Sequence, residues 1–216
     1  MIAAALWFNS GILLVADADG ATPGGDGSNA HAIFPKQYGA PPARATSIFV
    51  VSESGNRRVP AFHACEDALA RIPFDECTLD RMRQAVERCL VDTGDAEVDF
   101  VVLYGPKDRQ YSLFRTTGTL LQEVVGYDCE GPAASLGHSL MHDRYTAARS
   151  MDSLDLDTVF SIAMETLDAI RATRQACGSC SEMVVMYADG HLSDVQHLAH
   201  HTGKKRSAAL TALGRT

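Results

Sequence analysis

The sequence predicts an α+β protein built as a four-layer α–β–β–α sandwich, in which two stacked antiparallel sheets lie between pairs of helices. Three observations lead to this prediction. The patterned segments follow the order strands, two helices, strands, two helices, strands, and two stacked sheets with helices outside accommodate that order. The first strands are nearly continuous apolar runs, which is typical of sheets covered on both faces. The 216 residues are 46% hydrophobic, which suffices for one domain with a sizeable core.

The first half of the chain supplies strands and then a helix pair. Residues 2–8 and 12–16 are apolar runs joined by Asn-Ser-Gly, a good hairpin turn. The segment "HAIFPKQYG" predicts a short strand that Pro35 confines to an edge or an end, and residues 46–54 predict a stronger strand. Helical spacing follows Pro60 and continues over residues 78–92.

The second half repeats this order. Residues 98–105, 109–117 and 118–126 predict a three-strand meander with short polar turns. Residues 132–148 and 154–173 predict two helices, the second amphipathic, and a hairpin turned at Asp189-Gly190 follows them. We therefore expect one domain over residues 1–198 and a basic, flexible tail over residues 199–216.

Composition bears on the class of function. The net charge is −8, although the four charged residues of the tail are all cationic. An acidic body argues against a general nucleic-acid surface. We expect no membrane contact, because no apolar run reaches the length of a membrane span and the N-terminal run lacks the features of a signal peptide. Six scattered cysteines are expected to be reduced thiols in the cytoplasm.

Several segments together resemble the proteasome β-type subunits and their bacterial ring-peptidase relatives, which are N-terminal-nucleophile hydrolases. "GILLVADADG" resembles the family's second strand with its aspartate, and "GPAASLGHSLMHDRY" resembles its turn into the third helix. "DLDTVFSIAMETLDAIRATR" and "CGSCSEMVVMYADGH" resemble its fourth helix and last hairpin. The resemblance spans about residues 1–197. It implies the four-layer fold and assembly into a ring or double ring of like subunits, with other proteasome-like subunits as further candidate partners.

The resemblance also implies a catalytic arrangement, and this chain retains little of it. An N-terminal threonine supplies the hydroxyl nucleophile and the amine base, a lysine lowers the pKa of that amine, and an aspartate holds the lysine. Asp17 matches the aspartate. The nucleophile position is Met1 and the lysine position is interpreted as Ala32, since alternation points His31 to the other face. We therefore expect a non-catalytic subunit that needs no cofactor.

Two alternatives stay open. The first is an active peptidase or amidohydrolase of the N-terminal-nucleophile type with an altered N-terminus or an unusual nucleophile. For Asp17 itself, the alternative is a residue that ends a strand and caps a turn.

The second alternative concerns the thiols: Cys177 and Cys180 form a C-x-x-C motif that could bind zinc with downstream histidines. A Cys–His catalytic pair from Cys65 or Cys129 is also conceivable. Buried, inert cysteines are the commoner case.

Overall fold

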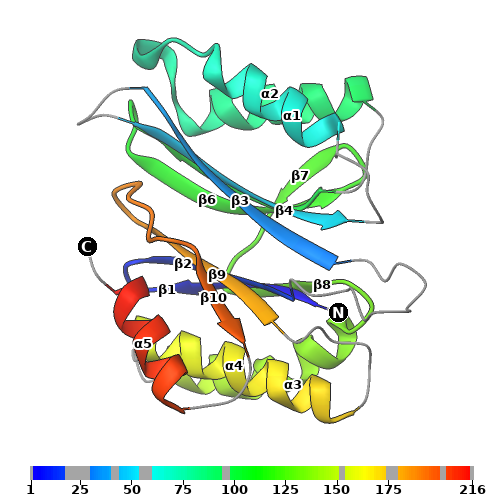
Figure 1. Cartoon of the computed structure of the whole chain (residues 1–216). Coiled ribbons are helices and arrows are strands. Elements are labelled where there is room, and N and C mark those ends of the chain that lie inside the picture. Colours follow the sequence, from blue (N-terminus) through cyan, green and yellow to red (C-terminus); the bar gives the residue numbers. More distant parts are fainter. Residues whose placement is uncertain are drawn as a thin grey trace.

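The computed structural model describes residues 2–17, 30–39, 44–53, 60–93, 98–150, 154–173, 180–199 and 203–214. Two five-stranded antiparallel sheets stack between two layers of helices (Figure 1). The predicted α–β–β–α sandwich is therefore confirmed. Sheet A has the strand order β10-β9-β2-β1-β8 and sheet B the order β3-β4-β5-β6-β7.

Sheet A begins with the N-terminal hairpin. Strand β1 (Ala3–Phe8) pairs with β2 (Gly11–Asp17) through a two-residue turn, and β2 is buried along its whole length. Gly11 is required there, because a Cβ atom would lie 2.2 Å from the carbonyl oxygen of Met186 on the neighbouring strand. The other strands of this sheet are β8 (Tyr127–Glu130), β9 (Cys180–Tyr187) and β10 (Gln196–Ala199).

Sheet B is a simple meander whose first strand lies at an edge, as Pro35 predicts. Its strands are β3 (Ala30–Tyr38), β4 (Ala45–Glu53), β5 (Val98–Gly105), β6 (Gln110–Thr117) and β7 (Leu120–Glu123).

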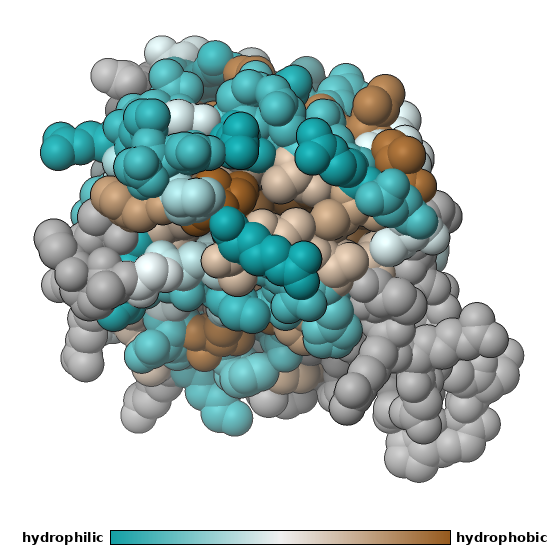
Figure 2. Space-filling model, turned by 90° about the horizontal axis from the view of Figure 1, so that it is seen from above, coloured by the Kyte–Doolittle hydropathy of each residue, from teal (hydrophilic) through white to brown (hydrophobic). Residues whose placement is uncertain are grey.

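Helices cover the outer face of each sheet (Figure 1). Sheet B is covered by α1 (Pro60–Ala70) and α2 (Leu79–Thr93), which a short 3-10 turn (Phe74–Glu76) connects. Seen from above, this layer is mostly hydrophilic with separate hydrophobic side chains between the polar ones (Figure 2). Sheet A is covered by α3 (Ala134–Ser150), α4 (Leu156–Ala172) and α5 (Gly203–Leu213). Within the ranges given above, no helix is both long enough and apolar enough to cross a bilayer.

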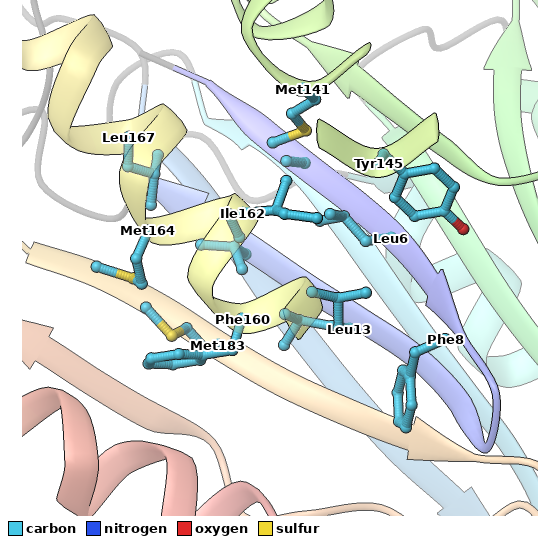
Figure 3. Packing of buried hydrophobic residues seen from close by; sticks show 14 of the residues in the cluster. Leu6, Phe8, Leu13, Met141, Tyr145, Phe160, Ile162, Met164, Leu167 and Met183 are labelled. Atoms are coloured by element: carbon cyan, nitrogen blue, oxygen red, sulfur yellow. The ribbon is translucent and has the colours of Figure 1, made fainter. Parts of the chain in front are cut away.

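Three hydrophobic clusters hold the layers together, one under each helix layer and one between the sheets. Leu13 and Phe160 belong to the cluster beneath α3 and α4 (Figure 3), whereas Ile12 and Leu14 face the other sheet. Alternate residues of β2 therefore enter different clusters, which explains why the strand is apolar throughout.

The structure differs from the sequence-based expectations at two places outside the site. The sequence analysis assigned no strand to residues 127–130, but they form β8, which pairs with β1 between two glycines of positive φ, Gly126 and Gly131. The tail was expected to be flexible, but residues 203–213 form α5. Leu213 of this helix is fully buried in the cluster under sheet A, and its carbonyl accepts the Tyr187 hydroxyl at 2.5 Å. Apolar residues within the basic tail cause this packing. The domain division at residue 198 itself stays a prediction.

Candidate active site

One end of the sandwich gathers the residues that the sequence analysis singles out. Strand β1 begins there, opposite the end of β2, and the Asp17 N–H donates to the carbonyl of Ile2 at 3.0 Å. This register follows from the short Asn-Ser-Gly turn, because a two-residue connection fixes which residues of the hairpin pair. Met1, the residue at the nucleophile position, lies outside the described residues.

Asp17 is fully buried and forms a salt bridge. Arg171, in the last turn of α4, approaches its Oδ1 atom with Nη2 at 3.2 Å, and the same nitrogen donates to the Ser181 hydroxyl at 2.8 Å. Ser181 pairs directly with Asp17 in the β2–β9 register. The Arg171 guanidinium therefore links α4 to β2 and β9, and the Asp17 carboxylate has a structural role as its partner. A catalytic task for Asp17 stays a prediction.

The side chains of β3 show which face of the strand Ala32 takes. Phe34 stacks on Phe62 of α1, and Lys36 forms a salt bridge with Glu66 of the same helix at 2.9 Å. The even-numbered residues of β3 thus face the helices, and Ala32 shares that face. Ile33 instead belongs to the cluster between the sheets.

His31 is therefore the residue of this segment that faces the space between the sheets, and Ala32 faces the helices. That Ala32 occupies the lysine position stays a prediction. The pattern "HAIF" does not show which face each of its residues takes. Both faces of the strand are covered, so Ile33 and Phe34 are both apolar and the phase of the alternation cannot be read from hydropathy.

His31 is 2% exposed, and neither of its ring nitrogens has a hydrogen-bond partner among the described residues. Its Nε2 atom lies 3.5 Å from Oδ2 of Asp99 on β5. The pKa of His31 is lowered to about 4, chiefly by burial and also by the positive amino terminus, whereas the Asp17 carboxylate opposes the shift. The imidazole is therefore neutral at pH 7.

Asp99 has the opposite shift. Burial raises the pKa of this carboxyl to about 6, against the Ser52 hydroxyl, which donates to Oδ2 at 2.6 Å. The carboxylate of Glu130 on β8 contributes to the same upward shift of the Asp99 pKa. His31 and Asp99 together are a pair of weak proton acceptors at the end of the sandwich, and the sequence offered no signal that would bring them together.

Strand β8 contributes a charged network beside this pair. Asp128 accepts from His138 of α3 at 2.8 Å and lies 3.3 Å from Arg115 of β6. Arg115 also lies 3.5 Å from Glu130, so one guanidinium links the two carboxylates of β8. Because Arg115 belongs to sheet B and β8 to sheet A, this network joins the two sheets.

The thiol alternatives gain no support from the described cysteines. Cys177 lies outside the described residues, and Cys180 begins β9 with its thiol 3.8 Å from the Ser181 carbonyl. Within the part of the chain that the structure describes, no three His, Cys, Asp or Glu side chains form a group that could hold a metal ion. Burial raises the pKa of the Cys65 and Cys129 thiols, so neither is an activated nucleophile.

This architecture is a four-layer α–β–β–α sandwich, and solved Anbu structures share it. Solved structures with this fold include Anbu from Hyphomicrobium sp. strain MC1, with a TM-score of 0.67 and 14% identity over 98% of this chain and 95% of that chain. Anbu (ancestral beta-subunit) from Yersinia bercovieri has a TM-score of 0.67 and 11% identity over 96% and 91% of the two chains. Thiobacillus denitrificans BPH has a TM-score of 0.50 and 13% identity over 87% and 98%.

No family model and no curated protein matches this sequence. The assignment to the proteasome β-type family, which the sequence motifs suggested, is therefore corrected. The similar structures are Anbu proteins that share only 11–14% of their residues with this chain, and what they share with it is the fold.

Proposed function

We propose that this protein is a proteasome-like subunit that assembles into a ring with copies of itself and does not hydrolyse peptides by the threonine mechanism. The fold supports the first part, since the similar Anbu structures cover 96–98% of this chain. The observation that carries the second part is the neutral His31 on the inter-sheet face of β3, near Asp17.

The threonine mechanism needs a cation next to the N-terminal amine, because a like charge lowers the pKa of the amine and makes it a base at neutral pH. His31 cannot supply this charge at pH 7, since burial keeps its imidazole neutral. The nearby cation, Arg171, is already bound to Asp17 and Ser181. Neither Met1 nor Ile2 carries a hydroxyl or thiol nucleophile.

Self-association is supported by large apolar side chains that a single chain leaves in solvent. Leu120, the first residue of β7, is 63% exposed, and Val125, in the connection between β7 and β8, is 76% exposed. Sedimentation at micromolar concentration tests this part, and we expect a species many times heavier than the 23.2 kDa chain. A species of monomer mass throughout would contradict it. Other proteasome-like subunits as partners and a cytoplasmic location remain predictions from the sequence.

One observation favours a second candidate, a hydrolase with an altered N-terminus or an unusual nucleophile. Both nitrogens of the buried His31 lack hydrogen-bond partners in the described part of the chain, and an idle buried imidazole is costly unless a further group uses it.

Labelling with a peptide vinyl sulfone separates the two candidates. The intact denatured mass is measured after incubation with the reagent, together with the release of amine from fluorogenic peptides. We expect an unchanged mass and no release. A stoichiometric adduct that disappears in a His31→Gln variant, with the variant still folded, would instead establish the hydrolase.

A further inference from the structure

A cavity lies at the end of the sandwich opposite to the candidate active site. Its volume is about 930 Å³, and it lies where the turn after β9 meets the ends of β3 and β5. Figure 1 shows this turn, drawn in orange, at the end of the sheets away from the label N. This volume falls within the range of small-molecule sites.

One wall of the cavity is held rigidly. Gly190 has a φ of +81°, and a Cβ atom there would lie 2.3 Å from the Tyr104 ring. The Gly190 carbonyl accepts from the Thr46 hydroxyl at 2.7 Å across the two sheets. The glycine and the aromatic ring are thus in direct contact, which fixes the turn of sheet A against sheet B.

Two arginines line the cavity and have no carboxylate partner among the described residues. Arg44 donates to the Gln37 side chain at 2.8 Å, and its Nε atom is buried without a partner. Arg109 also lines the cavity, and its side chain is exposed. Neither appears in a salt bridge between described residues. The chain as a whole is acidic, so two guanidinium groups without a described carboxylate partner are a local exception.

The acidic residues nearby bind backbone amides instead. Asp108 accepts from the N–H of Leu79 at the start of α2 and from the N–H of Gln110. Asp189, which lines the cavity, accepts from the N–H of His191 at 2.9 Å. These carboxylates stabilise a helix start and two turns, and they leave the arginines available for a ligand.

The backbone of Arg109 is strained. Arg109 has a φ of 53°, the one positive φ of a non-glycine residue among the described residues, and glycine would adopt this conformation without strain. A glycine would suit the turn better. The presence of an arginine at this position is therefore explained by its guanidinium group and not by the backbone of the turn. The cavity also has an apolar wall: Phe74, an aromatic residue that lines it, is 50% exposed.

From these features we propose that the cavity binds a small organic anion of the nucleotide class. Arg44 and Arg109 take the phosphate groups through paired N–H donors, which match phosphate geometry. The Phe74 ring contacts the planar base. This site shares no residue with the candidate active site, so it stands or fails independently of the proposed function.

Calorimetric titration of the full chain with adenosine diphosphate and with inorganic pyrophosphate tests the proposal. We expect both probes to bind, and the diphosphate nucleotide to bind more tightly. Arg44→Ala should weaken binding of both by about tenfold or more, as expected for the loss of a charged hydrogen-bond donor. Phe74→Ala should weaken the nucleotide alone.

Arg109→Gly separates binding from folding. It removes the strain, so we expect a higher melting temperature together with weaker binding. Lys107→Ala removes an exposed cation from the same turn but outside the cavity lining, and this control should leave both affinities within twofold. The proposal is overturned if neither probe binds at millimolar concentration, if Lys107→Ala weakens binding as much as Arg44→Ala, or if pyrophosphate binds as tightly as the nucleotide.

Discussion

Arg171 and Asp17 form a salt bridge between the last turn of α4 and the end of β2, with Nη2 and Oδ1 3.2 Å apart and the carboxylate fully buried. The residue that the sequence resemblance marks as catalytic is therefore held by a cation from the outer helix layer. This relationship gives Asp17 a structural role that does not depend on catalysis.

The first prediction concerns this pair. Asp17→Asn should lower the free energy of unfolding by about 3 kcal/mol, because it leaves Arg171 without its anionic partner in a mostly buried place. The double variant Asp17→Asn with Arg171→Met should recover part of this loss. Urea unfolding followed by circular dichroism measures both. The pairing is contradicted if the double variant loses more free energy of unfolding than the single variants Asp17→Asn and Arg171→Met lose together.

The second prediction concerns pH. The pKa of His31 is lowered to about 4 in the folded protein from about 6.5 in the unfolded chain, so the unfolded state binds the extra proton. The stabilisation from keeping this imidazole neutral is complete above about pH 6.5 and is lost as the pH falls to about 4, by up to about 3 kcal/mol.

Asp99 changes the folding stability in the opposite direction as the pH falls. Its pKa is raised to about 6, so the folded state binds the proton and gains stability as the pH falls from about 6 toward 4. The two residues should therefore partly cancel in the native protein. In His31→Gln only the Asp99 contribution remains, and the stability of this variant relative to the native protein should rise as the pH is lowered from 7 to 4. Chemical unfolding across that range measures it, and a difference that is independent of pH would refute the assignment.

The third prediction tests the contact between Gly190 and Tyr104. Gly190→Ala places a Cβ atom within 2.3 Å of the ring and imposes a side chain at positive φ. We expect a loss of roughly 2 kcal/mol or more, measured by thermal unfolding. Gly118→Ala is the matched control: its φ is also positive, but nothing lies within 4 Å of the added atom. Equal losses in both variants would show that the ring contact has no effect.

The fourth prediction tests the packing of α5. Leu213→Ala should destabilise the protein by about 2–5 kcal/mol, because the side chain is fully buried beneath sheet A. Thr211→Ala on the exposed side of the same helix should change stability by less than about 0.5 kcal/mol. If the two variants unfold at the same denaturant concentration, α5 does not pack as described.

Sequence reasoning succeeded where the local pattern and the tertiary environment agree. The hairpin that ends at Asp17 follows from two apolar runs and a turn, and the buried stripe of α4 follows from its helical spacing. Strand β8 was missed because "YDCE" has only four residues and polar side chains, and its partner β1 lies more than 120 residues earlier. Tertiary pairing rather than local preference forms this strand.

The site was harder to predict than the fold. Arg171 follows Leu167 by four residues, so helical spacing alone places it beside the buried stripe, and this signal could have identified a cation near sheet A. No comparable signal existed for His31. Its phase was ambiguous in a strand covered on both faces, and its contact with Asp99 joins strands that are distant in sequence.

The central claim, a self-assembled subunit without a threonine nucleophile, is tested most directly by mass spectrometry of one sample under native and then denaturing conditions. The account predicts a native mass that is a whole multiple of the chain mass and denatured chains that all retain Met1. A native mass of one chain, or denatured chains trimmed to begin at a serine, threonine or cysteine, would contradict it.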